Sequence, residues 1–286
     1  VAMLAVALRD MGSTVTLMAQ AVDAGVGRSA FEFLRVPSRP ANIWSALYFA
    51  GTVAQYVREH PERPLISFDR IPGVACIRAG DGSHQVYLES MGRSLSAKFS
   101  IKHRVQLSLE RKTYTHPNLR LVFANSKMVA EDIRRQYDVS DDKIRVVYTG
   151  LPARAKIPAT MRTSARLRLK LPESARVMLF AGHNYERKGL ATLLAALRIL
   201  EKHDPYRGKI GPWALLVAGR GDIPKYRRMA ARMQIAGKVE FLGPASLDEI
   251  FPAADLFVLP TRYDPLARVC MESVRAGVPV VTTRKN

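Results

Sequence analysis

The sequence predicts an α/β protein with two doubly wound parallel sheets. Short apolar runs alternate with helical stretches throughout the second half of the chain, which is the pattern of a parallel sheet flanked by helices. The length of 286 residues is more than one hydrophobic core usually holds, which favours two domains. Apolar runs such as 255–260 are typical of strands that are buried on both faces.

In the first half, the patterns predict helices over 1–11, 41–60 and 127–137, with Asn125-Ser126 capping the last of these. Strands are predicted over 14–18, 64–67, 74–77, 119–124 and 144–148. We expect residues 19–42 to form a polar connection and residues 84–118 to form a basic helical segment. The sequence opens inside a helix and closes just after a strand, so we expect both domains to be truncated.

In the second half, the same reasoning predicts strands over 176–181, 213–218, 238–242, 255–259 and 278–282. Helices are predicted over 188–203, 223–236, 246–253 and 267–276. Between the halves, residues 154–166 contain prolines and many basic residues, which is typical of a linker. The predicted domains are therefore 1–153 and 154–286.

The charge is strongly basic, with 44 Lys and Arg against 25 Asp and Glu and a net charge of +19. Such a balance indicates an anionic partner, which could be nucleic acid, a membrane surface or a phosphorylated substrate. The sequence has no helix-turn-helix, RNA-binding aromatic signature or zinc knuckle, so nucleic acid is not expected. No run of eighteen apolar residues predicts a membrane-spanning helix. Cys76 and Cys270 lie in apolar segments, which indicates buried thiols and a reducing compartment.

Two acidic residues flank the start of the helix predicted over 267–276. Asp264 follows a predicted strand, and Glu272 lies about one turn inside the helix, whose sheet-facing positions are predicted to be Val269, Cys270, Ser273, Val274 and Gly277. Loops at the carboxyl ends of parallel strands, followed by helix N-termini, are where α/β proteins bind anionic ligands. The alternative is a solvated loop acid beside an acid on a helix surface.

A second candidate site follows the strand predicted over 176–181. Gly182 allows a close turn of the backbone, and Arg187 and Lys188 stand at the expected start of the next helix. Two cations at a helix N-terminus oppose the helix dipole, so we expect an anion such as a diphosphate to compensate them. The alternative is a pair of surface bases.

The segment 84–118 interleaves basic residues with aliphatic and aromatic ones such as Leu95, Phe99 and Ile101. One interpretation is an ordinary exposed helix pair. The other is peripheral contact with an anionic membrane, since basic and apolar side chains together suit lipid headgroups. The net charge favours the membrane interpretation, and the basic residues that it assigns to this contact are Arg93, Lys98, Lys102, Arg104, Arg111 and Lys112.

Four stretches of the second half resemble a known family. The stretches GHNYERKGLATLLAAL, LLVAGRGD, VEFLGPAS and FPAADLFVLPTRYDPLARVCMESVRAGVPVVTT resemble the retaining glycosyltransferases of family four, which adopt the GT-B fold of two Rossmann-like domains. In the first half, FDRIPGVACIRAGDG, the basic helical segment and the ANS turn resemble the lipopolysaccharide core glucosyltransferase I subgroup.

The resemblance implies roles for the candidate residues. It makes Asp264 the contact to hydroxyls of the donor sugar and Glu272 the contact to the nucleotide ribose, although relatives have Glu at the first position. Arg187 and Lys188, near Gly182, match the pair that neutralises the leaving diphosphate. Backbone amides of Leu266 and Ala267 would meet the phosphates, although Pro265-Leu266-Ala267 replaces the glycine-containing loop of relatives.

Asp81, in the loop Ala79-Gly80-Asp81-Gly82, matches the acceptor-side residue near the anomeric carbon. Without the resemblance, the simplest interpretation of an acid between glycines is that it only forms a turn. With the resemblance, the chain is expected to be a cytoplasmic enzyme that is peripheral on the inner face of the cytoplasmic membrane.

The expected reaction moves a hexose from a nucleotide sugar, with UDP-glucose the first candidate, to a lipopolysaccharide-core or other lipid-linked glycan acceptor, itself a glycolipid or phosphorylated oligosaccharide. The scheme requires no metal and no cofactor, and the sequence has no loop with a paired-acid metal motif. The alternatives are a family-four transferase for capsule or exopolysaccharide, and a non-enzymatic basic module that binds anionic membrane or nucleic acid.

Overall fold

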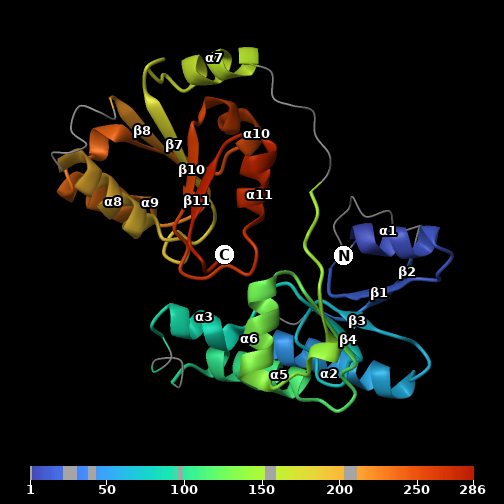
Figure 1. The fold of residues 1–286 in the computed structure, drawn as a ribbon. Helices are drawn as coiled ribbons and strands as arrows, with labels where there is room; N and C mark the ends of the chain where they lie inside the picture. The colour runs from blue at the N-terminus through green and yellow to red at the C-terminus, as the bar shows by residue number, and fades with distance from the viewer. Residues whose placement is uncertain are drawn as a thin grey trace. The chain divides into compact units, whose positions relative to one another are not determined.

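The structure, a computed structural model, describes residues 2–21, 31–37, 43–93, 95, 99–151, 159–202 and 211–286. The chain divides into two compact units, Val1–Tyr148 and Thr149–Asn286, a few residues before the boundary expected between 153 and 154. Figure 1 labels the helices and strands of both units.

The first unit has a four-stranded parallel sheet of order β3-β4-β5-β6 and a two-stranded parallel sheet of β1 and β2. Its strands are β1 (Thr16–Ala19), β2 (Glu32–Arg35), β3 (Ile66–Ser67), β4 (Cys76–Ala79), β5 (Leu121–Ala124) and β6 (Ile144–Val146). Its α-helices are α1 (Ala2–Asp10), α2 (Ile43–Glu59), α3 (His84–Ser90), α5 (Ile101–Tyr114) and α6 (Lys127–Tyr137).

One strand of this unit lies where the sequence predicts only a polar connection. β2 falls within 19–42 and pairs with β1 in register, Thr16 opposite Glu32. The prediction was wrong because β2 is an edge strand of four residues whose ends are exposed, and such a strand has little apolar signal. In contrast, the cap of α6 is confirmed, since the Ser126 hydroxyl accepts a hydrogen bond from the Val129 amide at 3.2 Å.

The second unit has a five-stranded parallel sheet of order β11-β10-β7-β8-β9. Its strands are β7 (Arg176–Ala181), β8 (Trp213–Ala218), β9 (Val239–Gly243), β10 (Leu256–Leu259) and β11 (Val280–Thr282). Its α-helices are α7 (Ala159–Arg168), α8 (Leu190–Lys202), α9 (Ile223–Arg232), α10 (Leu247–Ile250) and α11 (Arg268–Arg275). Figure 1 shows α8 and α9 on one side of this sheet and α11 on the other.

The strand order of the second sheet creates a topological switch point. The chain starts in the centre at β7, builds outward through β8 and β9, and then returns to the other side of β7 with β10 and β11. The loops that leave β7 and β10 therefore diverge to opposite faces of the sheet from neighbouring strands. Open α/β sheets bind ligands at this place, outside the carboxyl ends of the strands.

Part of the predicted linker belongs to the second unit. α7 begins at Ala159 and is anchored by the buried Arg166, whose guanidinium donates to the Asp255 carboxylate at 2.8 Å. Arg166 also donates to the carbonyls of Glu173 at 2.7 Å and Ala175 at 3.0 Å. The linker prediction was wrong for 159–166 because a basic composition does not reveal that one arginine is buried. Residues 154–158 of the predicted linker lie outside the described residues.

Each unit has a hydrophobic core of its own. The core of the first unit is built from β4, β5 and the helices around them, with Val122, Ala124, Val129 and Ile133 almost fully buried. The core of the second unit surrounds β7, β8 and β10. The continuous apolar runs in these three strands are explained by their burial on both faces.

Candidate active site

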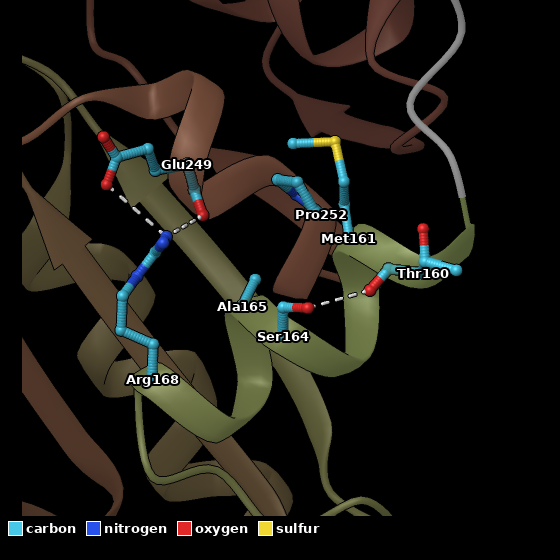
Figure 2. A pocket seen from close by; sticks show the side chains of 7 residues that line it. All are labelled: Thr160, Met161, Ser164, Ala165, Arg168, Glu249 and Pro252. Atoms are coloured by element: carbon cyan, nitrogen blue, oxygen red, sulfur yellow. Dashed lines mark hydrogen bonds and ion pairs between the residues drawn. The ribbon is translucent and has the colours of Figure 1, made fainter.

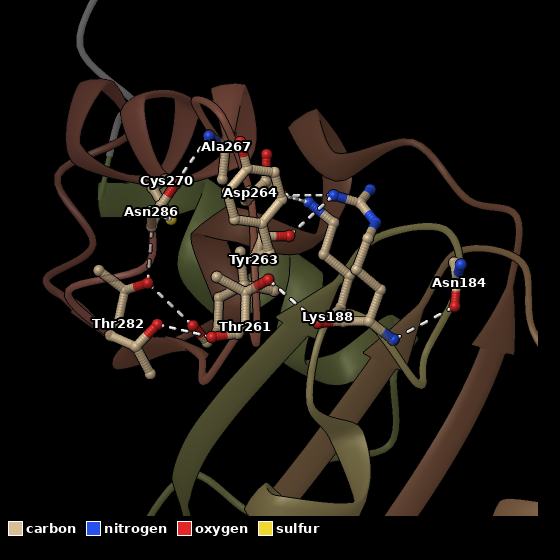
Figure 3. A network of polar contacts seen from close by, with 12 residues as sticks. Asn184, Lys188, Thr261, Tyr263, Asp264, Ala267, Cys270, Thr282 and Asn286 are labelled. Carbon is tan, nitrogen blue, oxygen red and sulfur yellow. Dashed lines mark hydrogen bonds and ion pairs between the residues drawn. The ribbon is translucent and has the colours of Figure 1, made fainter. Parts of the chain in front are cut away.

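Two cations and one carboxylate meet at the switch point of the second unit (Figure 3). Lys188, in the turn after β7, forms an ion pair with Asp264, in the loop after β10. Arg187 Nη1 lies 3.3 Å from Asp264 Oδ2 and donates to the Tyr263 carbonyl at 3.2 Å. The structure thus brings two adjacent cations together with a carboxylate that lies 76 positions after Lys188 in the sequence.

Burial makes this cluster costly to disrupt. Lys188 is 7% exposed and Asp264 is 5% exposed. A buried carboxylate that loses its cation is strongly destabilised, because neither solvent nor another charge compensates it. The interpretation of Asp264 as a solvated loop acid and of Lys188 as a surface base is therefore wrong. The sequence also missed that the carboxylate compensating the two cations belongs to the chain itself.

The turn that carries the cations is held by its own backbone and by the β10 loop. Asn184 adopts φ 62°, and its Oδ1 accepts from the Arg187 amide at 3.2 Å. The Arg187 carbonyl in turn accepts from the Thr261 hydroxyl at 3.1 Å and from the Arg262 amide at 2.9 Å. α8 begins only at Leu190, so the cations precede the helix rather than open it as expected. Asn184 was overlooked, although Asn before a helical turn is a common capping signal.

Glycines bring the two loops together. A Cβ on Gly189 would lie 1.9 Å from the Pro260 carbonyl oxygen, at the end of β10. A Cβ on Gly182 would lie 3.2 Å from Lys188 Cγ, so the missing side chain leaves room for the lysine. Gly182 thus makes room for the Lys188 side chain, a neighbour that was not predicted from the sequence.

The start of α11 places the remaining donor-site candidates. The Ala267 amide donates to Asn286 Oδ1 at 2.7 Å, so this expected phosphate contact is already occupied by a side chain of the same unit. Leu266 is half-buried beside it. Glu272 lies inside α11, 25% exposed at its side chain, with Arg268 3.8 Å away. Asn286 also donates to Thr282 Oγ1 at 3.2 Å, a role that no sequence pattern predicts.

The sheet-facing side of α11 differs in part from the prediction. Cys270 and Ser273 are buried, as expected, but Val274 is 65% exposed and Gly277 is exposed too. The cause is geometric, because a helix of eight residues presents only a narrow stripe to the sheet. Burial raises the pKa of the Cys270 thiol. It also raises the pKa of the Cys76 thiol, which is only half-buried.

Asp81 lies in the first unit, in the loop between β4 and α3. Its side chain is exposed at the carboxyl end of β4, whereas Gly82 and Ser83 after it are buried. Asp81 also affects Asp69, which is an exposed residue. The pKa of Asp69 is raised first by desolvation and second by the negative charge of Asp81. The position of Asp81 in its loop is as predicted, and its role in transfer stays a prediction.

The described residues of the basic segment include the helices α3 and α5. Lys102, Arg104, Arg111 and Lys112 are exposed on α5, and Arg93 is half-buried. Lys98 lies outside the described residues. Apolar side chains accompany these bases in solvent, since Leu95 is 75%, Phe99 90% and Ile101 65% exposed.

A pocket in the second unit is lined by none of these candidates. Figure 2 shows it between α7 and α10, lined by Thr160, Met161, Ser164, Ala165, Arg168, Glu249 and Pro252.

None of the described helices is both long and apolar enough to cross a bilayer. Among the described residues, no three or more His, Cys, Asp and Glu side chains are grouped as a metal site would need.

Solved structures share this fold along almost the whole chain. The structure of WaaG, a glycosyltransferase involved in lipopolysaccharide biosynthesis, matches with a TM-score of 0.79 at 20% identity, covering 99% of this chain and 76% of that one. Anabaena HepE, in complex with UDP and glucose, matches with a TM-score of 0.63 at 16% identity, covering 100% and 77%. The fold is therefore that of GT-B glycosyltransferases, as expected.

Sequence comparisons give the family. The model described as Glycosyltransferase Family 4 matches residues 1–154, more than half of the chain, and Glycosyl transferases group 1 matches 175–286. A probable transglycosylase of Burkholderia thailandensis is 29% identical over 97% of this chain and 71% of its own length. Lipopolysaccharide glucosyltransferase WaaG of Escherichia coli K12 is 24% identical over 89% and 68%. The chain belongs to glycosyltransferase family 4 and is an enzyme of that class, which contradicts the non-enzymatic alternative.

Proposed function

We propose that the protein transfers a hexose, with retention, from a nucleotide sugar to a glycan acceptor, and that UDP-glucose and the lipopolysaccharide core are the first donor and acceptor to test. The pairing of Arg187 and Lys188 with Asp264 at the switch point carries the proposal. It is supported by HepE, whose structures contain UDP, glucose and UDP-glucose, and by WaaG, a lipopolysaccharide glucosyltransferase.

In the proposed reaction, the bond between sugar C1 and the diphosphate oxygen breaks and its electron pair goes to the diphosphate. An acceptor hydroxyl attacks C1 from the same face, and its proton passes to an oxygen of the leaving phosphate. Arg187 and Lys188 stabilise the charge that develops on the diphosphate. Asp81 acts beside the anomeric carbon, so that residues 1–153 serve the acceptor and residues 154–286 bind the nucleotide sugar.

Asp264 has two tasks in this proposal. Its carboxylate orients hydroxyls of the donor sugar, and it holds the two cations where a diphosphate can bind them. The carboxylate has two oxygens, and only Oδ2 receives the ion-pair contacts of Arg187 and Lys188.

The two cations also lead us to propose that transfer needs no metal and no other cofactor. Each of them supplies a positive charge where a metal ion would otherwise neutralise the diphosphate. Transfer at the same rate with and without excess EDTA is the expected result, and restoration of a lost activity by Mg²⁺ or Mn²⁺ would overturn this part.

Calorimetric titration of UDP, GDP, ADP and their sugars tests the donor. We expect selective binding of UDP and UDP-glucose, and replacement of Glu272 by Ala should weaken it about tenfold to a hundredfold through loss of a charged hydrogen bond to ribose. Glu249→Ala is the matched control, because Glu249 is likewise a helix acid beside an arginine, with Arg168 at 3.5 Å. Absence of any nucleotide binding, or equal effects of both variants, would overturn the donor assignment.

We further propose that the enzyme works as a cytoplasmic, peripheral protein on the inner face of the cytoplasmic membrane. The support is the basic face of α5 with Phe99 and Ile101 exposed beside it. Lipid-linked acceptors are presented at such a surface. An acceptor screen that includes capsule and exopolysaccharide precursors separates the lipopolysaccharide acceptor from the second enzyme alternative.

Charge reversal at Lys98, Lys102 and Arg104 is expected to weaken binding to vesicles that contain anionic lipid, on the order of a hundredfold. Each basic residue near such a surface contributes about 1 kcal/mol. Co-sedimentation at low salt measures the effect. The control reverses Lys225, Arg228 and Arg232, which are exposed on α9 and change the net charge equally. Equal loss in both variants would mean that only total charge matters and would contradict the assigned contact.

A further inference from the structure

The loop that carries Asp81 is fixed on both sides of this residue. Before it, Asn125 Nδ2 donates to the Gly80 carbonyl at 2.8 Å, and after it, Arg70 Nη2 donates to the Gly82 carbonyl at 2.9 Å. Asn125 is 5% exposed and follows β5, the neighbour of β4 in the sheet. The backbone of the loop 80–83 is therefore anchored on both sides of Asp81, whereas the Asp81 side chain is exposed.

A buried carboxylate organises the same loop from below. Glu110, on α5, is fully buried, with no exposed side-chain surface. Its two oxygens accept five hydrogen bonds, from Ser83 Oγ at 3.0 Å, the His84 amide at 2.7 Å, the Gln85 amide at 3.3 Å, Arg70 Nε at 2.7 Å and the Tyr137 hydroxyl. Glu110 therefore connects the loop to the start of α3, to Arg70 and to α6. Backbone amides in the first turn of a helix need a cap, and here the Glu110 carboxylate accepts from two of them while Ser83 Oγ accepts from the Val86 amide at 3.3 Å.

The charges around Glu110 balance. Burial by itself would lower the pKa of the Arg70 guanidinium, but the Glu110 carboxylate, Tyr114 and Asp81 together outweigh this effect, and the pKa is raised. Burial, followed by the charge of Glu110, raises the pKa of Tyr137, so this residue stays a hydroxyl donor. Burial and the charge of Arg70 lower the pKa of His84 to about 4, so its ring is neutral near pH 7 and adds no competing cation.

We propose that Glu110 is a positioning residue for transfer, which sets the orientation of Asp81 through Ser83 and the first turn of α3. The inference rests on the proposed function, in which Asp81 acts beside the anomeric carbon. Glu110 itself has no access to substrate, because it is completely buried. Its effect on the reaction must therefore pass through the loop, and a displacement of about 1 Å at a reacting group can cost about a hundredfold in rate.

Hydrogen exchange tests the mechanical part without any substrate. The His84 and Gln85 amides bond to different oxygens of Glu110. In Glu110→Gln, one of these oxygens becomes an amide nitrogen that cannot accept, so at least one of the two backbone amides is expected to exchange at least tenfold faster. The matched control is Asp255→Asn, which likewise removes a carboxylate bonded to an arginine and to a backbone amide, that of Val177 at 2.7 Å. Unchanged exchange of the His84 and Gln85 amides in Glu110→Gln would overturn the proposal.

A double-mutant cycle tests the catalytic part. We expect Glu110→Gln to lower kcat on the order of a hundredfold with the KM for the nucleotide sugar within about twofold. Combined with Asp81→Asn, it should add no further loss, because a residue that acts through Asp81 has nothing left to position. Multiplying losses would overturn the positioning role. Ser83→Ala, which keeps the buried ion pair, should repeat the effect more weakly if Glu110→Gln folds poorly.

The two arms separate this inference from the function on which it rests. A wild-type protein that transfers no sugar would contradict the proposed function, while the exchange of the His84 and Gln85 amides still decides whether Glu110 fixes the loop. Transfer in the wild type together with rigid loop amides in Glu110→Gln would contradict the inference and leave the proposed function standing.

Discussion

Replacement of Arg187 and Lys188 together by alanine is expected to abolish nucleotide-sugar binding and also to destabilise the second unit. Binding is lost because the diphosphate has no cation left to bind. Stability is lost because Asp264, 5% exposed, is left without a partner, which typically costs about 3–5 kcal/mol. Calorimetric titration of UDP measures the first effect and chemical unfolding the second. The sequence alone predicts loss of binding with the fold intact, so the structure adds the second effect.

A third substitution separates the two effects. Asp264→Asn added to the double variant removes the unpaired charge and should recover part of the lost stability, whereas UDP binding should stay absent. Unchanged UDP affinity in the double variant would refute the donor site. Equal stability of the double and triple variants would show that the buried carboxylate is not the source of the instability.

Gly189→Ala is expected to destabilise the second unit by about 3 kcal/mol or more, as measured by urea unfolding. The residue has φ +81°, which disfavours any side chain, and its Cβ would lie 1.9 Å from the Pro260 carbonyl oxygen. The turn that carries Lys188 and the loop that carries Asp264 would be forced apart, so UDP affinity should fall as well.

Gly277→Ala is the control for the backbone contribution. Gly277 has φ +79°, nearly the same, but no atom within 4 Å of its Cβ position. It should cost only about 1 kcal/mol and leave UDP binding unchanged. A similar cost at both positions would mean that the contact with Pro260 relaxes freely, and the close approach of the two loops would lose its importance.

The strands of the second unit were predictable from sequence to within about two residues. β7, β8 and β10 are buried on both faces, so their apolar runs are continuous and bounded by glycine or polar residues. β2 and α7 were missed because neither has a continuous apolar run in the sequence. β2 is half exposed, and α7 is held by a buried Arg166, which a composition-based view takes for a solvent-exposed charge.

The candidate residues were predictable, but their partners were not. Lys188 and Asp264 each follow a strand, and their meeting depends on β7 and β10 being neighbours, which is a property of strand order. Likewise, Glu110 lies in a helix rich in Lys and Arg, where an acid is most simply explained as a surface charge. Only the tertiary packing of α5 gives it five donors, three from the loop after β4 and the start of α3, one from Arg70 and one from Tyr137 of α6, and removes it from water.

The two hydrophobic cores share no residue among the described parts of the chain. A single melting temperature would therefore mix two transitions, and a two-state fit would not return a defined free energy. If nucleotide binds the second unit, saturation at a hundred times Kd raises the stability of that unit by about 2.7 kcal/mol. Thermal shift of the whole protein is thus a poor screen for donors unless a probe reports on one core, and Trp213, buried in the second core, provides one.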